Sequence, residues 1–135
     1  MIKKILFIGI CILLLASLVG CAEKDPNIVT INGDGSFTAE ECQSRGLNDQ
    51  VIMFESKYCS HCKETLPDFI AACEDYNITP IILDLSEAEQ MAQFETYDIE
   101  IVGTPTFIFG CNYMVAVKTK EVYLASLDTF LSTQV

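Results

Sequence analysis

Hydrophobic and polar residues are arranged along most of the chain in a way that predicts strands alternating with helices. Short apolar or β-branched runs predict strands at residues 27–31, 51–54, 79–85, 106–109 and 113–117. Amphipathic stretches predict helices that begin near residues 38, 59, 86 and 124. The order β-α-β-α-β-α-β-β-α indicates an α/β fold: a central mixed β-sheet with helices on both faces and an antiparallel hairpin near its end.

Turn and cap residues mark the element boundaries. Thr38 with Glu41, and Ser86 with Glu89, have the spacing of a capping box and predict two helix starts. Gly46 predicts the end of the first helix. Residues 110–112 (Gly-Cys-Asn) predict the hairpin connection between the last two strands.

The N-terminal segment has the layout of a targeting signal. Lys3 and Lys4 precede an apolar run at 5–19, which is shorter than the roughly 20 residues of a membrane span. Leu-Val-Gly-Cys at 18–21 resembles the lipobox of bacterial lipoproteins, and that resemblance implies cleavage before Cys21 and its lipidation. The alternative is an ordinary secretory signal or an uncleaved anchor. Both alternatives predict a working domain outside the cytoplasm.

We therefore expect a signal peptide at 1–20, a lipidated anchor and tether at 21–26, and one domain at 27–135. The whole chain has a formal charge of −11; without residues 1–20 it keeps 6 basic and 19 acidic residues, a charge of −13. So acidic a surface argues against nucleic-acid binding. It also offers no basic patch for anionic lipid, so membrane attachment would depend on the acyl chains at Cys21.

The sequence Cys59-Ser60-His61-Cys62 lies between a predicted strand and a predicted helix. A helix N-terminus favours the thiolate over the thiol and lowers the cysteine pKa, so this placement favours a redox centre. Lys63 in place of histidine excludes covalent haem attachment. A structural zinc site would need two more ligands, and the sequence has no second pair of closely spaced cysteines or histidines, so we expect no metal. A purely structural disulfide is the remaining alternative, although so short a loop would stabilise little.

Five further cysteines complete the seven of the chain. Cys11 lies in the predicted signal peptide and Cys21 at the predicted anchor. Cys42, Cys73 and Cys111 form an odd set, in which two pair or each is a buried, inert thiol. The sequence does not decide between these arrangements.

Four features together resemble the thioredoxin superfamily over residues 27–133. They are the strand followed by the Cys-x-x-Cys motif, Pro67 five residues after Cys62, the segment Val-Gly-Thr-Pro-Thr at 102–106, and the final hairpin with its helix. The resemblance implies a thioredoxin fold and a cis peptide bond before Pro105. An X–Pro bond adopts the cis form at a cost of only about 0.5–1 kcal/mol, so a fold can fix it there.

The resemblance also implies roles for individual residues. Cys59 would be the nucleophile and Cys62 the resolving thiol, and His61 would stabilise the Cys59 thiolate unless it is merely solvated. Thr104 and Pro105 would contact the cysteines and the substrate, and Tyr58 would cover the site.

The proton acceptor is a departure from the family. The family's buried carboxylate, six residues before the first cysteine, is replaced by Met53. Glu55 points to the same side of the strand and is the candidate proton acceptor, the alternative being a solvent-facing glutamate.

These features predict a membrane-anchored, extracytoplasmic thiol–disulfide oxidoreductase acting on cysteine-containing proteins. Its redox-active disulfide would replace any cofactor, and a membrane redox partner would restore it. His61 and Thr104 favour the oxidase or isomerase direction over the reductase direction. The alternative function is a non-enzymatic lipoprotein of the same fold that binds a protein or a soft metal such as Cu(I).

Overall fold

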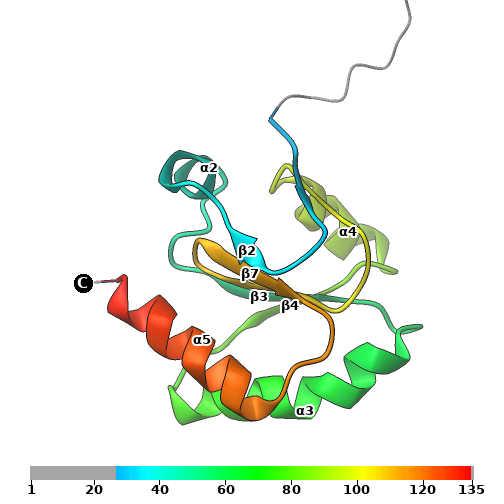
Figure 1. The fold of residues 1–135 in the computed structure, drawn as a ribbon. Coiled ribbons are helices and arrows are strands. Elements are labelled where there is room, and N and C mark those ends of the chain that lie inside the picture. The colour runs from blue at the N-terminus through cyan, green and yellow to red at the C-terminus, as the bar shows by residue number, and fades with distance from the viewer. Residues whose placement is uncertain (1–26, 135) are drawn as a thin grey trace, which may run out of the picture.

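The structure, a computed structural model, describes residues 27–134, and the predictions for the signal peptide, Cys21 and the tether lie outside these residues. Figure 1 shows the arrangement of the elements. In chain order they are β1 (Val29–Ile31), β2 (Gly35–Ser36), α2 (Ala39–Ser44), β3 (Val51–Glu55), α3 (Ser60–Asp75), β4 (Ile81–Asp84), α4 (Ala88–Glu95), β5 (Ile99–Ile101), β6 (Thr106–Phe109), β7 (Asn112–Val115) and α5 (Lys120–Ser132).

The central sheet is mixed, as the sequence predicted. Its five strands lie in the order β2-β7-β6-β3-β4, with β3 and β4 parallel and the other neighbours antiparallel. β1 and β5 form a separate parallel pair. The first four residues of β3 are all buried, which explains why its sequence is a continuous apolar run rather than an alternating one.

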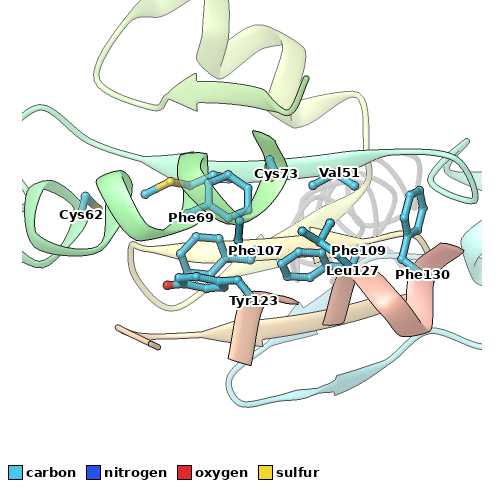
Figure 2. Close-up of a cluster of buried hydrophobic side chains, with 11 residues drawn as sticks. Val51, Cys62, Phe69, Cys73, Phe107, Phe109, Tyr123, Leu127 and Phe130 are labelled. Atoms are coloured by element: carbon cyan, nitrogen blue, oxygen red, sulfur yellow. The ribbon is translucent and has the colours of Figure 1, made fainter. Parts of the chain in front are cut away.

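Helices cover both faces of the sheet (Figure 1). α3 and α5 lie on one face, and α2 and α4 lie on the other. Each face of the sheet has its own hydrophobic core, and alternate residues of β3 point into one or the other. Val51 and Met53 pack under α3 and α5, whereas Ile52 and Phe54 pack on the opposite side. Figure 2 shows the first core, in which Cys62 of α3 lies in the same cluster as aromatic rings from β6 and α5. The α/β architecture predicted from the sequence is confirmed.

One of the two predicted capping boxes is present. Thr38 Oγ1 accepts from the backbone N–H of Glu41, and the Glu41 carboxylate accepts from the N–H of Thr38 at 2.8 Å. The box predicted at Ser86 is wrong: α4 is capped by Glu87 without a side-chain bond, because the Ser86 hydroxyl and N–H both donate to Asp84. A carboxylate two residues back competes for the hydroxyl that a cap would need.

Two short strands and one helix start differ from the prediction. β2 has two residues and β5 three, too few to show any period in the sequence. α5 begins at Lys120 rather than at residue 124, and its first buried residue is Tyr123, whose ring joins the core under α3.

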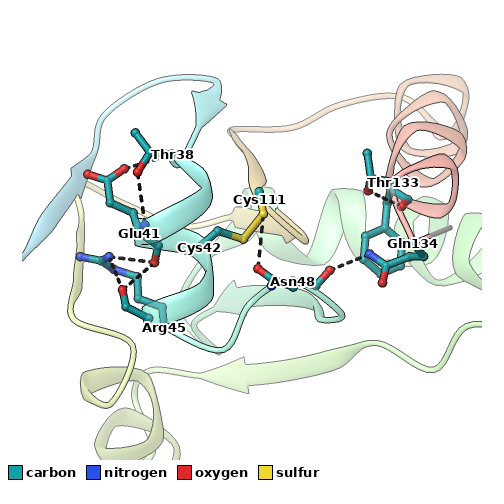
Figure 3. The surroundings of a disulfide bond; sticks show 10 residues. Thr38, Glu41, Cys42, Arg45, Asn48, Cys111, Thr133 and Gln134 are labelled. Atoms are coloured by element: carbon teal, nitrogen blue, oxygen red, sulfur yellow. Dashed lines mark hydrogen bonds between the residues drawn. A yellow bond between two sulfur atoms is a disulfide. The ribbon is translucent and has the colours of Figure 1, made fainter.

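Outside the motif, the cysteines of residues 27–134 divide into one pair and one free thiol. Cys42 of α2 and Cys111 of the β6–β7 turn form a disulfide with an S–S distance of 2.07 Å (Figure 3). Asn48 lies beside it, with Oδ1 3.6 Å from Cys111 Sγ, and its carbonyl accepts from the Gln134 side chain. Cys73 is a free, fully buried thiol on α3, and burial raises its pKa to about 11.

Candidate redox site

The two cysteines of the motif lie at the N-terminus of α3 and are joined as a disulfide. Cys59 is the N-cap residue of the helix, and its Sγ accepts a hydrogen bond from the backbone N–H of Cys62 at 3.1 Å. Cys59 is part-buried, whereas Cys62 is fully buried in the core under α3 and α5. The N–H of Cys62, in the first turn of the helix, therefore points at the more accessible sulfur, that of Cys59, where it would stabilise a thiolate.

The loop before β6 lies against the same sulfur. The Thr104–Pro105 peptide bond is cis, as predicted from the sequence. The carbonyl oxygen of Thr104 is 3.4 Å from Cys59 Sγ, close enough to accept from the thiol once the disulfide is reduced. The loop is held by Thr106, whose hydroxyl donates to the Gly103 carbonyl, and by the N–H of Ala116, which donates to the Pro105 carbonyl.

The segment before Cys59 is attached to the end of β4. The N–H of Lys57 donates to Asp84 at 3.3 Å, and its ammonium forms a 2.7 Å ion pair with Glu87. Tyr58 follows with 81% of its surface exposed, and the Lys57 ammonium lies 5.4 Å from the centre of its ring. Tyr58 thus presents an open aromatic surface next to Cys59 in sequence, and its role in covering the site stays a prediction.

His61 is exposed on the first turn of α3. Its Nδ1 lies 3.4 Å from a carboxylate oxygen of Glu64. Sequence reasoning missed Glu64, although its position three residues after His61 on a predicted helix is a signal for such a pair. Both residues line a pocket together with Thr104 and Pro105, so the structure brings His61 to the side of the proline loop.

Glu55 lies at the end of β3, on the same face as Met53. Met53 is fully buried, and Glu55 is part-buried beside its parallel partner Asp84. Partial burial and the negative charge of Asp84 raise the pKa of the Glu55 carboxyl. Among the hydrogen bonds of residues 27–134, none joins this carboxylate to the cysteine pair. Its proposed role in proton transfer stays a prediction.

Two further features of the described residues concern metal binding and the membrane. In the part of the chain that the structure describes, no group of three or more His, Cys, Asp or Glu side chains is placed to hold a metal ion. Within the same residues, no helix has both the length and the apolar character needed to cross a membrane.

Comparison with known proteins gives the family. Among solved structures, the chain is similar to a poplar thioredoxin h (21% identity over 78% of this chain and 96% of that chain, TM-score 0.45) and to mitochondrial thioredoxin 3 of Saccharomyces cerevisiae in its oxidised form (17% over 78% and 99%, TM-score 0.44). No curated protein sequence matches the chain significantly. The family model for thioredoxin matches residues 33–132, which include the cysteine pair, the cis-proline loop and both helices under the sheet. The chain has the thioredoxin fold and belongs to the thioredoxin family of thiol–disulfide oxidoreductases.

Proposed function

We propose that this chain is a lipid-anchored, extracytoplasmic enzyme that exchanges disulfides with protein cysteines through Cys59 and Cys62. One observation carries the proposal: the part-buried sulfur of Cys59 at the start of α3 accepts a helix N–H at 3.1 Å. A reactive thiol needs access and a stabilised anion, and partial exposure and this N–H supply them. Tyr58, next to Cys59 in sequence, and Val102, two residues before Thr104, are exposed and offer apolar surface for a polypeptide.

The exchange moves two electrons, and the two cysteines are its redox group. With the pair reduced, the Cys59 thiolate attacks a substrate disulfide, forms a mixed disulfide and releases one substrate thiolate. Cys62, which is fully buried, then gives its proton to an acceptor, for which Glu55 is the candidate, and attacks Cys59 Sγ. This step closes the Cys59–Cys62 disulfide and releases the second substrate thiolate. Oxidation of a substrate dithiol runs the same steps in reverse.

The direction we propose is that of an oxidase or isomerase. His61 supports it, because an imidazole near the first helical turn adds a donor or a positive charge that favours the reduced, anionic form. A stabilised reduced form makes the pair a stronger oxidant. A membrane redox protein would then reoxidise the pair after each turnover of a cysteine-containing substrate, or keep it reduced for isomerisation.

The anchor is a separate part of the proposal, and the lipobox-like sequence ending at Cys21 supports it. Growth of an expressing bacterium with labelled palmitate should label the full chain and leave a Cys21→Ser variant unlabelled. The variant should also leave the membrane fraction. Equal labelling of both proteins would contradict lipidation at Cys21.

The reduction potential tests the redox assignment. Residues 22–135 are equilibrated in glutathione or dithiothreitol buffers, and the oxidised fraction of the Cys59–Cys62 pair is measured. A potential between about −120 and −180 mV supports the oxidase or isomerase, and one near −270 mV indicates a reductase. A pair that never titrates as a disulfide would refute the redox function.

A further inference from the structure

A pocket of about 330 Å³ lies beside the redox pair and has two kinds of wall. His61 and Glu64 of α3 form one side, and Thr104, Pro105, Ala116 and Val117 form the other. Thr104, one of these lining residues, also has its carbonyl oxygen 3.4 Å from Cys59 Sγ. A side chain next to a substrate cysteine bound at Cys59 would therefore reach this pocket, since successive residues of an extended chain are only about 3.3 Å apart.

The chemistry of the walls is apolar at the base and acidic at the edge. Pro105 is buried, and the N–H of Ala116 donates to its carbonyl at 3.0 Å, which holds the apolar side of the pocket together. Glu64 supplies a carboxylate to the lining, and about two thirds of its side chain is exposed. An apolar wall ending in a carboxylate suits a side chain with an aliphatic stem and a cationic head.

Neither lysine near the pocket in sequence neutralises the Glu64 carboxylate. Lys118, next to the lining residue Val117, forms a 2.8 Å ion pair with Asp34. Lys63 precedes Glu64 in sequence but is not part of the lining, and adjacent residues on a helix do not face each other. His61, 3.4 Å from the carboxylate, compensates its charge only when the imidazole is protonated.

We propose that this pocket receives a lysine or arginine side chain flanking the substrate cysteine, and that Glu64 selects substrates for it. This inference depends on the proposed disulfide exchange and adds its substrate class: polypeptides with a basic residue beside the exchanged cysteine. The net charge of −11 agrees with it, because a negative surface steers cationic partners towards the protein.

The test measures discrimination between matched disulfide peptides. One peptide has lysine beside the reacting cysteine, the second has acetyl-lysine, which keeps the stem and removes the charge, and the third has glutamate. Second-order rate constants for their reduction by the reduced full chain are divided by the rates with dithiothreitol, which corrects for differences between the peptides themselves. We expect lysine to be preferred over acetyl-lysine about three- to fivefold, the size typical of an exposed charge pair.

Two variants of α3 separate Glu64 from the overall charge. Glu64→Gln and Glu74→Gln each remove one negative charge, and Glu74 is an exposed residue near the other end of the same helix. The lysine preference should fall towards unity in Glu64→Gln and persist in Glu74→Gln. Because the readout is a ratio, a change in intrinsic cysteine reactivity cancels. Equal preference in the two variants, or none in the unsubstituted protein, would overturn the inference.

A charge reversal gives a result that partial unfolding cannot imitate. In Glu64→Lys the glutamate peptide should react faster than the lysine peptide, the opposite of the unsubstituted protein. An unchanged order in this variant would also refute the assignment to Glu64. If no peptide reacts with any of these proteins, the proposed disulfide exchange itself fails, and the inference fails with it.

Discussion

The two disulfides of the described domain differ in the length of chain that they close. Cys42 and Cys111 are 69 residues apart, whereas Cys59 and Cys62 are three apart. In the chain-entropy description, the longer loop stabilises the folded state by about 4 kcal/mol and the shorter loop by about 2 kcal/mol. The first bond fastens α2 to the turn of the β6–β7 hairpin; the second joins residues that the helix already holds together.

Burial does not distinguish the two bonds, because each joins a fully buried cysteine, Cys42 or Cys62, to a part-buried one. The position of the part-buried sulfur does: that of Cys111 lies in a hairpin turn, whereas that of Cys59 lies at a helix start. Cys59 is part-buried and accepts a helix N–H, so reduction would expose a stabilised anion there. The comparison teaches that the length of the closed loop and the helix N–H at one sulfur, rather than burial, separate a cross-link suited to stability from one suited to exchange.

The largest effect should come from the short bond. Cys59→Ser removes the proposed nucleophile and should reduce disulfide exchange to the uncatalysed background. The assay is reduction of a protein or peptide disulfide by the prereduced chain. The double variant Cys42→Ser with Cys111→Ser is the control and should keep its activity. Loss of exchange in the control alone would reverse the roles assigned to the two bonds.

Removal of the long bond should give the largest change in stability. Cys42→Ala with Cys111→Ala should lower the free energy of unfolding by about 4 kcal/mol, because the unfolded chain regains the freedom of a long loop. Urea unfolding under oxidising conditions measures the change. Cys59→Ala with Cys62→Ala is the matched pair and should cost less. Similar losses for both pairs would contradict the comparison.

A smaller effect concerns the reduction potential of the Cys59–Cys62 disulfide. His61→Ala should lower the reduction potential of the Cys59–Cys62 pair by about 5–20 mV, the equivalent of 0.3–1 kcal/mol for a charge or donor near a helix terminus. Equilibration in dithiothreitol buffers measures it. An unchanged or higher potential would show that the imidazole is only solvated.

The smallest effect should come from Glu55. Burial and Asp84 raise its pKa in the folded state, so ionisation of this carboxyl opposes folding. The stability of the unsubstituted protein should therefore decline relative to Glu55→Gln as the pH rises above about 4.3, the ordinary pKa of glutamate, through the folded-state value. Urea unfolding of both proteins at pH 3.5 and 7 measures this. A stability difference that stays constant between these pH values would contradict a raised pKa for Glu55.

Much of the site followed from local sequence patterns. The Cys-x-x-Cys motif after an apolar run placed the redox pair at a helix start, and the resemblance of residues 102–106 to the family's loop implied the cis bond at Pro105. These features depend on neighbouring residues, so a single sequence contains them. The cap at Thr38 was predicted for the same reason, since its partner Glu41 is three residues away.

What the sequence did not reveal depends on distant contacts. Whether Cys42 pairs with Cys73 or Cys111 depends on how α2 packs beside the hairpin turn, and no local pattern records that. The pocket at Glu64 likewise needs the end of β7 brought beside α3. β5 has only three residues and was missed because its pairing with β1, rather than its own sequence, defines it.

The buried thiol of Cys73 has a practical consequence for counting reactive groups. At neutral pH this thiol is protonated and fully covered, so an alkylating reagent applied to the native protein should not modify it. Within residues 27–134, alkylation before and after reduction then reports the state of the two disulfides alone. The same reagent in denaturant should modify one additional site in this domain, and Cys73 thereby supplies an internal chemical marker of its global unfolding.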